Sequence, residues 1–540
     1  MKKTIAILLV AVLAAGSVFA GISGEGKIAY GYDLDSKNTG FTNSTNLKVN
    51  VDLATASEEK QAEGAIYAAV KGDLTLKLYN GAKGDSTDEP MAWGGNTGLD
   101  FIAISDVSAT INGAEWSVDI LNSGKQLDLA KSAIDSSTKH KQLDNYGKKL
   151  GDKTDATTYK VGFNAAPGFT ATYKGYSVGL GFQYKDADSK DLVGKKFADT
   201  YSTGDMVKFY KGTDFSIVAK TPEIAVADEN KVQAGASFYN NETASVSIGT
   251  KSSEWKTEFD KFKTNRGSAI GGSVAVTYAN DTMSAKVAAD LGYAIKAYKV
   301  TTTTDKKTAT GIEENKDAEK FGMDLAANFT MDPVTVDAYY KFDGTNKEAV
   351  DANYLSLQVK TDLNAFDVPV VLTVYGTDLF RFAPTGKDIN SLSSSTTFGL
   401  KADVAVMAGL TVNGEVAITP CMVPSKAAKE EKFVGWSAKA GAKYEADLFT
   451  IEGGIKLYNA GFNTSTKPED IKPTDDYKAA VNKVVLAANA KVSSTTLVPG
   501  ATLALEYSGD DLLKSLNDAY KAAKELNTYG SVTASCKVAF

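Results

Sequence analysis

The chain has 540 residues, of which 43% are hydrophobic and 23% charged, and it has a formal net charge of -7 and a sequence pI of about 5.2. This composition is that of a large ordered protein, and the acidic balance argues against a nucleic-acid partner. Only 11 residues are proline and two are cysteine, so long uninterrupted strands are tolerated and a disulfide scaffold is excluded.

The first twenty residues have the organisation of a secretory signal peptide. Lys2 and Lys3 precede a short apolar run, and small residues lead to Ala20, after which we expect cleavage. Gly21 stands where a lipoprotein would carry cysteine, so no lipid anchor is expected there. The alternative is a retained membrane helix, but a spanning helix needs about 20 apolar residues and the run is shorter. No second run of that length follows, which excludes an α-helical membrane protein.

Apolar and polar residues alternate throughout the mature chain, which places successive side chains on opposite faces of a strand. Between Leu47 and Leu53 every second residue is apolar and the residues between them are polar. The same alternation is found in segments 176–185, 321–329, 334–340, 398–406, 436–444 and 449–457. Most segments have about nine to thirteen residues, which suits a tilted strand crossing a bilayer. Aromatic residues such as Tyr176 and Tyr184 end the apolar stripes and would form interfacial girdles.

Short and long connections alternate as well. Tight turns are expected at 280–281, 331–333, 408–409 and 446–447, and long polar connections at 297–317, 378–393, 421–432, 460–477 and 509–528. This arrangement is typical of a bacterial outer-membrane barrel. We therefore predict an all-β fold: a large antiparallel transmembrane β-barrel of roughly 20 strands over residues 21–540, after a signal peptide at 1–20, with long outward loops and some short loop helices.

Two segments interrupt the alternation. Residues 122–155 predict a long loop with some helix, and 510–526 has apolar residues at helical spacing. The second segment predicts a loop helix packed on the barrel mouth, with a membrane-binding or partner-binding helix as the alternative. For the whole pattern the alternative is a soluble β-sandwich array or β-solenoid. The many charges on the polar face and the light, Ala- and Gly-rich apolar stripes favour the barrel.

The last strand also alternates, with Val538 and Phe540 on its apolar face. An amphipathic strand ending in Phe is similar to the signal by which outer-membrane barrels are recognised for assembly, so Phe540 and Val538 are the candidate assembly residues. This end, the Tyr-rich alternation and the opening residues Gly24, Gly26, Ile28, Tyr30 and Tyr32 together resemble the treponemal major outer sheath protein family, which is related to the treponemal repeat proteins.

The resemblance implies an abundant, pore-forming surface protein that forms homo-oligomers, as a trimer, and binds host extracellular matrix proteins such as fibronectin. It also implies an N-terminal region at about 21–230 and a C-terminal barrel region at about 231–540. The early strands alternate as well as the late ones, so we expect one barrel over both regions.

Charged residues on the polar strand faces are the candidate pore-lining residues. A Lys facing lipid near the bilayer midplane costs about 2–4 kcal/mol, so these residues must face water or each other. The candidates are Lys48, Asp52, Lys77, Lys160, Lys185, Asp324, Asp337, Lys401, Asp403, Glu415, Lys439, Lys443, Glu452, Lys456 and Lys491. The lumen is then polar, either open or plugged by a folded loop and closed by ion pairs.

Enzymatic chemistry is not expected, and no catalytic residue, cofactor or metal is assigned. His140 is the one histidine and lies in a polar loop. Carboxylates in segment 469–476 predict an acidic loop, with calcium binding as the alternative. Cys421 and Cys536 are expected to lie near opposite ends of the barrel and to stay unlinked.

The sequence thus predicts a surface-exposed protein of the bacterial outer membrane, in contact with outer-membrane lipid. Its expected function is that of a porin-like channel for small solutes whose surface loops also act as an adhesin. The alternative is an adhesin or structural surface protein with a plugged, non-conducting barrel, and an outer-membrane hydrolase is the third possibility.

Overall fold

The computed structural model describes residues 22–35, 37–41, 46–52, 66–77, 102–122, 124, 126–134, 168–185, 206–209, 212–240, 244–247, 266–302, 309–314, 320–343, 353–377, 379, 396–422, 433–459, 484–509, 512–515 and 529–539. In some short strands and in parts of longer ones only the backbone is described. Within these ranges no helix is long and apolar enough to cross a membrane.

Most of the described residues lie in strands of one large sheet. Its main strands are β1 (Ile22–Asp33), β3 (Asn46–Asp52), β4 (Tyr67–Lys77), β5 (Ile102–Asn112), β6 (Trp116–Asp119), β7 (Gly168–Tyr173), β8 (Tyr176–Lys185), β10 (Gly212–Lys220), β12 (Asn230–Asn240), β14 (Arg266–Ala279), β15 (Met283–Thr302), β17 (Lys320–Met331), β18 (Val334–Asp343), β19 (Asn353–Asp362), β20 (Val370–Thr377), β21 (Thr397–Met407), β22 (Leu410–Met422), β23 (Phe433–Glu445), β24 (Thr450–Asn459), β25 (Val484–Ser494), β26 (Ala501–Gly509) and β27 (Ser531–Ala539).

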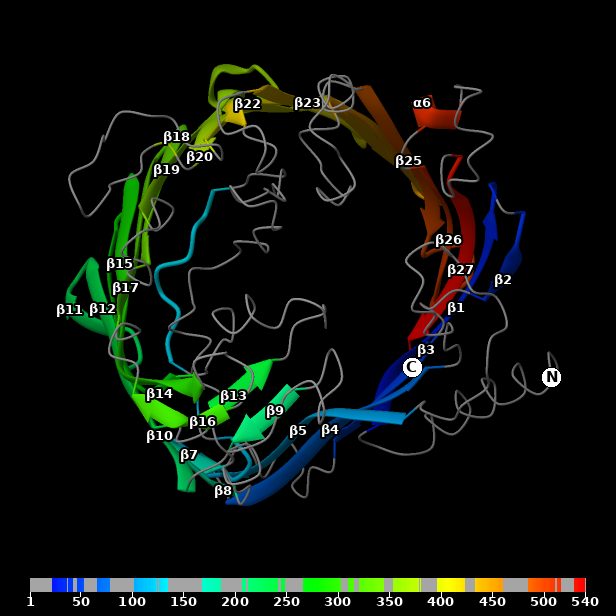
Figure 1. Ribbon diagram of the computed structural model, residues 1–540. Helices are drawn as coiled ribbons and strands as arrows, with labels where there is room; N and C mark the ends of the chain where they lie inside the picture. The colour runs from blue at the N-terminus through cyan, green and yellow to red at the C-terminus, as the bar shows by residue number, and fades with distance from the viewer. Residues whose placement is uncertain are drawn as a thin grey trace.

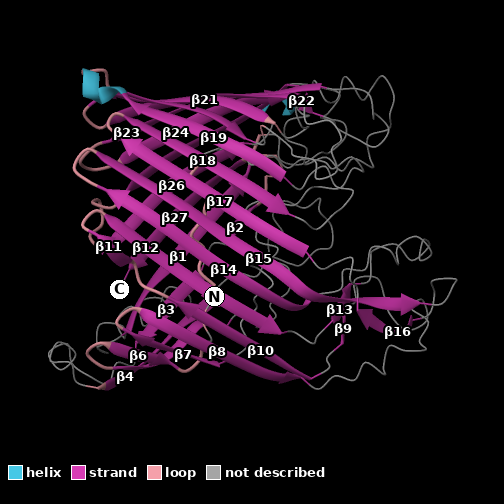
Figure 2. Cartoon of the chain, turned by 90° about the vertical axis from the view of Figure 1, so that its left-hand side faces the viewer, coloured by secondary structure: helices cyan, strands magenta, loops and turns pink. Residues whose placement is uncertain are grey.

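Smaller elements accompany this sheet. They are the strands β2 (Thr39–Phe41), β9 (Met206–Phe209), β11 (Ile224–Ala227), β13 (Ala244–Ser247) and β16 (Ala309–Glu314), the 3-10 helix η5 (Leu363–Phe366) and the α-helix α6 (Leu512–Ser515). Strands β9 and β13 pair with each other and, within the described ranges, with no other strand. They project with β16 beyond one end of the large sheet (Figure 2).

The main strands pair antiparallel with their neighbours, and the succession of pairings returns to its first strand (Figure 1). β1 pairs with β3 along one edge and with β27 along the other, where Glu25 lies opposite Ala539 and Asp33 opposite Ser531. Following the pairings through the described residues passes 22 strands, drawn from both the 21–230 and the 231–540 regions. The predicted all-β fold is confirmed, and the strand number agrees with the estimate of roughly 20.

Next to this pairing of the first and last strands, further hydrogen bonds join the residues that follow β1 to those that precede β27. The carboxylate of Asp35 accepts hydrogen bonds from the backbone N–H of Tyr529, at 2.9 and 3.0 Å, and of Gly530, at 3.1 Å. The backbone N–H of Leu34 also donates to the carbonyl of Gly530 at 2.9 Å. Gly530 has φ of 86°, a left-handed conformation that glycine adopts without steric cost.

Short and long connections lie at opposite ends of the strands, and the strands are inclined to the barrel axis (Figure 2). The predicted tight turns are confirmed between β14 and β15, β17 and β18, β21 and β22, and β23 and β24. One long connection begins later than predicted, because β15 has twenty residues and runs on to Thr302, where it pairs with β16. Another also begins later, since β22 continues to Met422 and contains the backbone of Cys421.

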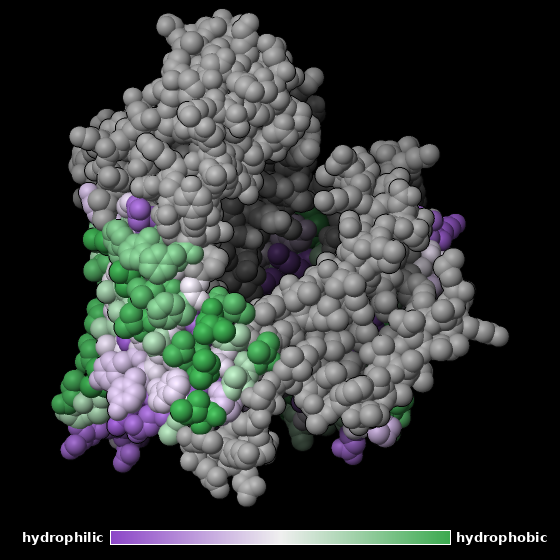
Figure 3. Space-filling view, turned by 90° about the horizontal axis from the view of Figure 1, so that it is seen from below, coloured by the Kyte–Doolittle hydropathy of each residue, from purple (hydrophilic) through white to green (hydrophobic). Residues whose placement is uncertain are grey.

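The outer face of the wall is apolar. On β24, Ile451 and Ile455 are 44% and 51% exposed on this face, whereas Glu452 and Lys456, which follow them, have the opposite strand parity. Figure 3 shows apolar atoms spread over the described part of one outer face, with hydrophilic atoms at its lower edge. Aromatic rings cluster on β8, β10 and β12: the ring of Phe215 is 5.1 Å from that of Phe182 and 6.2 Å from that of Phe238. The interfacial girdles stay a prediction.

The expected loop helices are found only in small part. The described residues of 122–134 contain no helix, and in 510–526 the described helix is the four-residue α6. Among the described residues of this segment, backbone groups bond to the barrel wall instead, as shown below. His140 and the acidic segment 469–476 lie outside the described residues.

The two cysteines give a test of the strand order. Cys536 is a free thiol on the outer face of β27, opposite Ile28 and Leu503, whereas Cys421 ends β22 at the long-connection end. A disulfide needs Cα atoms within about 7 Å, which this placement does not allow. We expect mass spectrometry of the non-reduced protein to find both thiols free, and a Cys421–Cys536 disulfide would contradict the strand order.

Candidate pore interior

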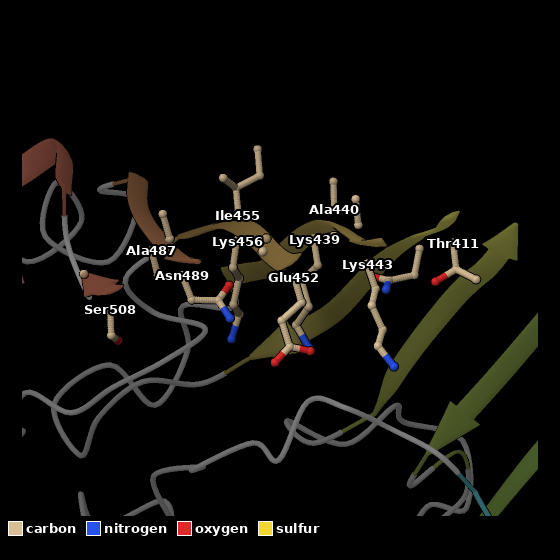
Figure 4. A pocket seen from close by; sticks show the side chains of 17 residues that line it. Thr411, Lys439, Ala440, Lys443, Glu452, Ile455, Lys456, Ala487, Asn489 and Ser508 are labelled. Atoms are coloured by element: carbon tan, nitrogen blue, oxygen red, sulfur yellow. The ribbon is translucent and has the colours of Figure 1, made fainter. Parts of the chain in front are cut away.

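The inner face of the wall carries the charged side chains that alternate with the apolar outer residues. In Figure 4 the side chains of Glu452 and Lys456 extend to the opposite side of the sheet from that of Ile455. Strand parity places Lys439 and Lys443 of β23 on the same inner face. Each strand forms backbone hydrogen bonds with both neighbours, and its side chains point alternately outward and inward. The charged residues of each strand therefore line the inside of the ring.

Ion pairs join these charges between neighbouring strands. Lys439 Nζ lies 3.4 Å from Glu415 Oε2, and Lys491 Nζ lies 3.2 Å from Glu452 and 3.6 Å from Glu506. Within strands, Lys401 lies 3.2 Å from Asp403 and Lys443 lies 2.5 Å from Glu445. Most of these side chains are more than a third exposed, so they set the local charge of the wall more than its stability.

Tyr375 anchors the most buried of these pairs. The tyrosine is 2% exposed, and its hydroxyl donates to Glu415 Oε1 at 2.6 Å. Its ring lies over Gly399 of β21: a Cβ at that glycine would be 2.0 Å from the ring, so only glycine permits this approach. Glu415 thus has hydrogen-bonding partners on two sides, which a buried carboxylate requires.

A second polar group lines β17, β18 and β19. Asp337 is 4% exposed and accepts hydrogen bonds from the amides of Asn328 at 2.6 Å and Gln358 at 3.0 Å. Asp324, equally buried, accepts from the hydroxyl of Tyr339 at 3.2 Å. These carboxylates face the interior and accept these hydrogen bonds from side chains of the wall.

The segment that follows β6 lies inside the ring against β12, β14 and β15 (Figure 1, cyan). Asp290 of β15, 2% exposed, accepts hydrogen bonds from the backbone N–H of Leu129, at 3.1 Å, and of Ala130, at 2.6 Å. Gln126 Oε1 accepts from the Ser237 hydroxyl at 3.1 Å, and the Ser273 hydroxyl donates to the carbonyl of Leu127 at 2.8 Å. We call residues 122, 124 and 126–134 the inner segment.

Small residues on the inner face make room for the inner segment. A Cβ at Gly235 would lie 2.9 Å from the side chain of Leu127, and a Cβ at Gly271 would lie 2.3 Å from that of Gln126. Further along, Ala130 is buried against Ala275 and Ala288. The wall is thus shaped to receive this segment, since larger side chains at these positions would displace it.

The structure describes the side chains of some of the predicted pore-lining residues and not those of the others. The inner face carries Asp324, Asp337, Lys401, Asp403, Glu415, Lys439, Lys443, Glu452, Lys456 and Lys491. Lys48, Asp52, Lys77 and Lys185 lie in β3, β4 and β8, with side chains outside the described part. Lys160 and Phe540 lie outside the described residues, and Val538 lies on β27 with outward parity.

Sequence reasoning missed the residues that hold the inner segment. Asp290 shares strand parity with Lys286, so its alternation could have identified it as an inner charge. Gln126 and Ser273 carry no such signal, because their contact joins positions 147 residues apart. Among the described residues no group of three or more His, Cys, Asp and Glu side chains is arranged to hold a metal ion.

No protein-family model matches the chain, and no curated protein matches it either. Solved structures that it resembles include a mutant of the Rh. blastica porin, with a TM-score of 0.27 and 9% identity over 96% of this chain and 99% of that one. Another is OccAB4 of Acinetobacter baumannii, with a TM-score of 0.32 and 9% identity over 96% of this chain and 97% of that one. TM-scores and identities this low establish no shared function.

Replacing Asp290 with Asn tests the attachment of the inner segment. Hydrogen bonds to a charged group contribute about 1.5–3 kcal/mol, so we expect hydrogen exchange of the Leu129 and Ala130 amides to rise by about 10- to 100-fold. Mass spectrometry of peptides covering 126–134 measures this. The matched control is Asp324→Asn. It removes the charge of a neighbouring inner carboxylate, which accepts a hydrogen bond from the Tyr339 hydroxyl. Equal exchange in both variants would show that Asp290 does not hold the segment.

Proposed function

We propose that this protein is a porin-like channel for small solutes in the bacterial outer membrane. The observation that carries the proposal is the separation of the two faces of one ring of strands. Large apolar side chains cover the outside, and paired Lys, Asp and Glu cover the inside.

A lipid environment accounts for this arrangement on physical grounds. Every backbone polar group must be paired inside a membrane, and a ring of antiparallel strands achieves this without a free edge. The exposed apolar outer face is stable against lipid tails, whereas the charged inner face requires water.

Ring size supports conduction. Barrels well beyond eight strands leave space that side chains do not fill, and the pairings here pass 22 strands in the described part of the chain. The described inner segment follows the wall instead of crossing the middle of the ring (Figure 1). A water-filled path beside it is therefore part of the proposal.

The inner segment also supports the alternative, a non-conducting barrel that serves as a platform for an adhesin. Its attachment to Asp290 and its fit against glycine and alanine show that the wall holds chain inside the lumen. In 22-stranded transporters of the outer membrane the lumen is plugged. Conductance separates the two functions.

The resemblance to the treponemal major outer sheath proteins adds finer proposals. With the short connections in the periplasm, the long connections face outward, where they bind host matrix proteins such as fibronectin. The chain assembles into a homo-oligomer, a trimer by the same resemblance. Binding of the purified protein to immobilised fibronectin, compared with the heat-denatured protein, tests the adhesive part.

Single-channel recording in a planar bilayer tests the central proposal. We expect the purified protein to produce stepwise, voltage-independent conductance that is lost on heat denaturation. Protein that inserts, as judged by protease protection, but gives no current would establish the plugged platform instead.

The same recordings give ion selectivity. The described inner face of β21 to β26 carries five lysines, Lys401, Lys439, Lys443, Lys456 and Lys491, and five carboxylates, Asp403, Glu415, Glu445, Glu452 and Glu506. Because these charges balance, we expect a reversal potential close to zero in a KCl gradient. Strong exclusion of K⁺ or Cl⁻ would contradict this balance.

A further inference from the structure

A pocket of about 480 Å³ lies on the inner face of β22 to β26 (Figure 4). Its floor is a row of residues that lie opposite one another on neighbouring strands: Asn413, Gly441, Gly454, Asn489 and Ser508. The two glycines have no side chains to fill the space above them. Lys439 and Lys456 border the pocket on one side of this row, and Lys443 and Glu452 border it on the other.

Charge is distributed unevenly around this pocket, although the described inner charges of β21 to β26 balance. Lys439 and Lys456 lie directly opposite each other on β23 and β24. Like charges in such positions repel each other and destabilise the pair. The carboxylate of Glu415 lies next to them. It already accepts a hydrogen bond from the Tyr375 hydroxyl and forms an ion pair with Lys439. This edge of the pocket therefore has more positive than negative charge.

Lys456 contributes most of the excess. Among the described residues it forms no ion pair, and its ammonium lies 4.8 Å from the centre of the Tyr458 ring. The residue opposite Lys456 on β25 is Ala487, whose side chain is uncharged. An aromatic face stabilises a cation weakly and leaves its other N–H groups able to donate to an incoming anion.

The amides of two asparagines complete the set of donors. Asn413 is diagonal to Lys439 across the β22–β23 pair, and Asn489 is diagonal to Lys456 across the β24–β25 pair. Both are exposed to the pocket, and neither amide hydrogen-bonds to another described residue. Their side-chain oxygens lean over the glycines: Asn413 Oδ1 is 2.8 Å from a Cβ placed on Gly441, and Asn489 Oδ1 is 3.3 Å from one on Gly454.

We propose that this pocket binds a small oxyanion, a carboxylate or phosphate group, between the ammonium groups of Lys439 and Lys456 and the side-chain amides of Asn413 and Asn489. Charge-assisted hydrogen bonds from Lys to an oxyanion are short and strong, and the bound anion removes the repulsion between the two lysines. Because Gly441 and Gly454 have no side chains, the oxyanion can approach the backbone of the sheet. The inference rests on the proposed channel function, for which it names a class of solute.

Binding of inorganic phosphate is measured first, by ³¹P line broadening with folded protein in detergent micelles, because this needs no conduction. We expect saturable binding that weakens at least tenfold in Lys456→Gln. The matched control is Lys491→Gln, which removes the same charge one strand away, where the lysine pairs with Glu452 and Glu506; it should change binding less than threefold. Lys456→Arg, which keeps the charge, should retain binding and reports on correct folding.

Block of the KCl current by added phosphate or acetate is measured second, and distinguishes the two groups. Phosphate, with its higher charge, should block at lower concentration than acetate, and Lys456→Gln should relieve both. Saturable binding without any current would overturn the channel and keep the site. Absent binding, or equal loss in Lys456→Gln and Lys491→Gln, would overturn the site and keep the channel.

Discussion

Pairing of the first strand with the last is the constraint on which the rest of the structure depends. β1 has β27 on one side and β3 on the other, so neither end of the sheet exposes unpaired backbone. In lipid an unpaired N–H or C=O costs several kcal/mol, and only a helix or a ring of strands avoids this cost. Asp35, bonded to the backbone of Tyr529 and Gly530, holds the two chain ends together next to this seam.

Once the ring is formed, strand alternation divides the side chains into two environments. Residues such as Ile455 lie outside, and their neighbours such as Lys456 lie inside. A shift of one residue in any pairing would exchange the faces and bring lysine or glutamate into lipid, so the charges also fix the register. The inner segment and the pocket both depend on this, because glycines at inner positions leave space only in the observed register.

The sequence predicted the features that depend on local pattern. Alternation gave the strands, the tight turns and the inward charges, because each needs only neighbouring residues. It did not predict that 122–134 lies against the wall, since Asp290 and Gln126 meet partners more than a hundred residues away. Likewise the Asn413–Gly441–Gly454–Asn489 row exists only when four strands come into register. The end of β15 was placed too early because polar residues such as Lys299 and Thr301 still pair with β16. The end of β22 was placed too early because its pairing with β23 resumes at Met422, beyond an irregularity in the register.

The most direct test of this account is the accessibility of single cysteines along β24 in protein reconstituted into lipid, with Cys421 and Cys536 replaced by serine. A water-soluble maleimide should label Glu452→Cys and Lys456→Cys in intact liposomes, and should label Ile451→Cys and Ile455→Cys only after denaturation, because a thiol surrounded by lipid forms no reactive thiolate. Labelling of all four positions in intact liposomes by the water-soluble reagent would show that the outer face meets water and would contradict a membrane-spanning barrel.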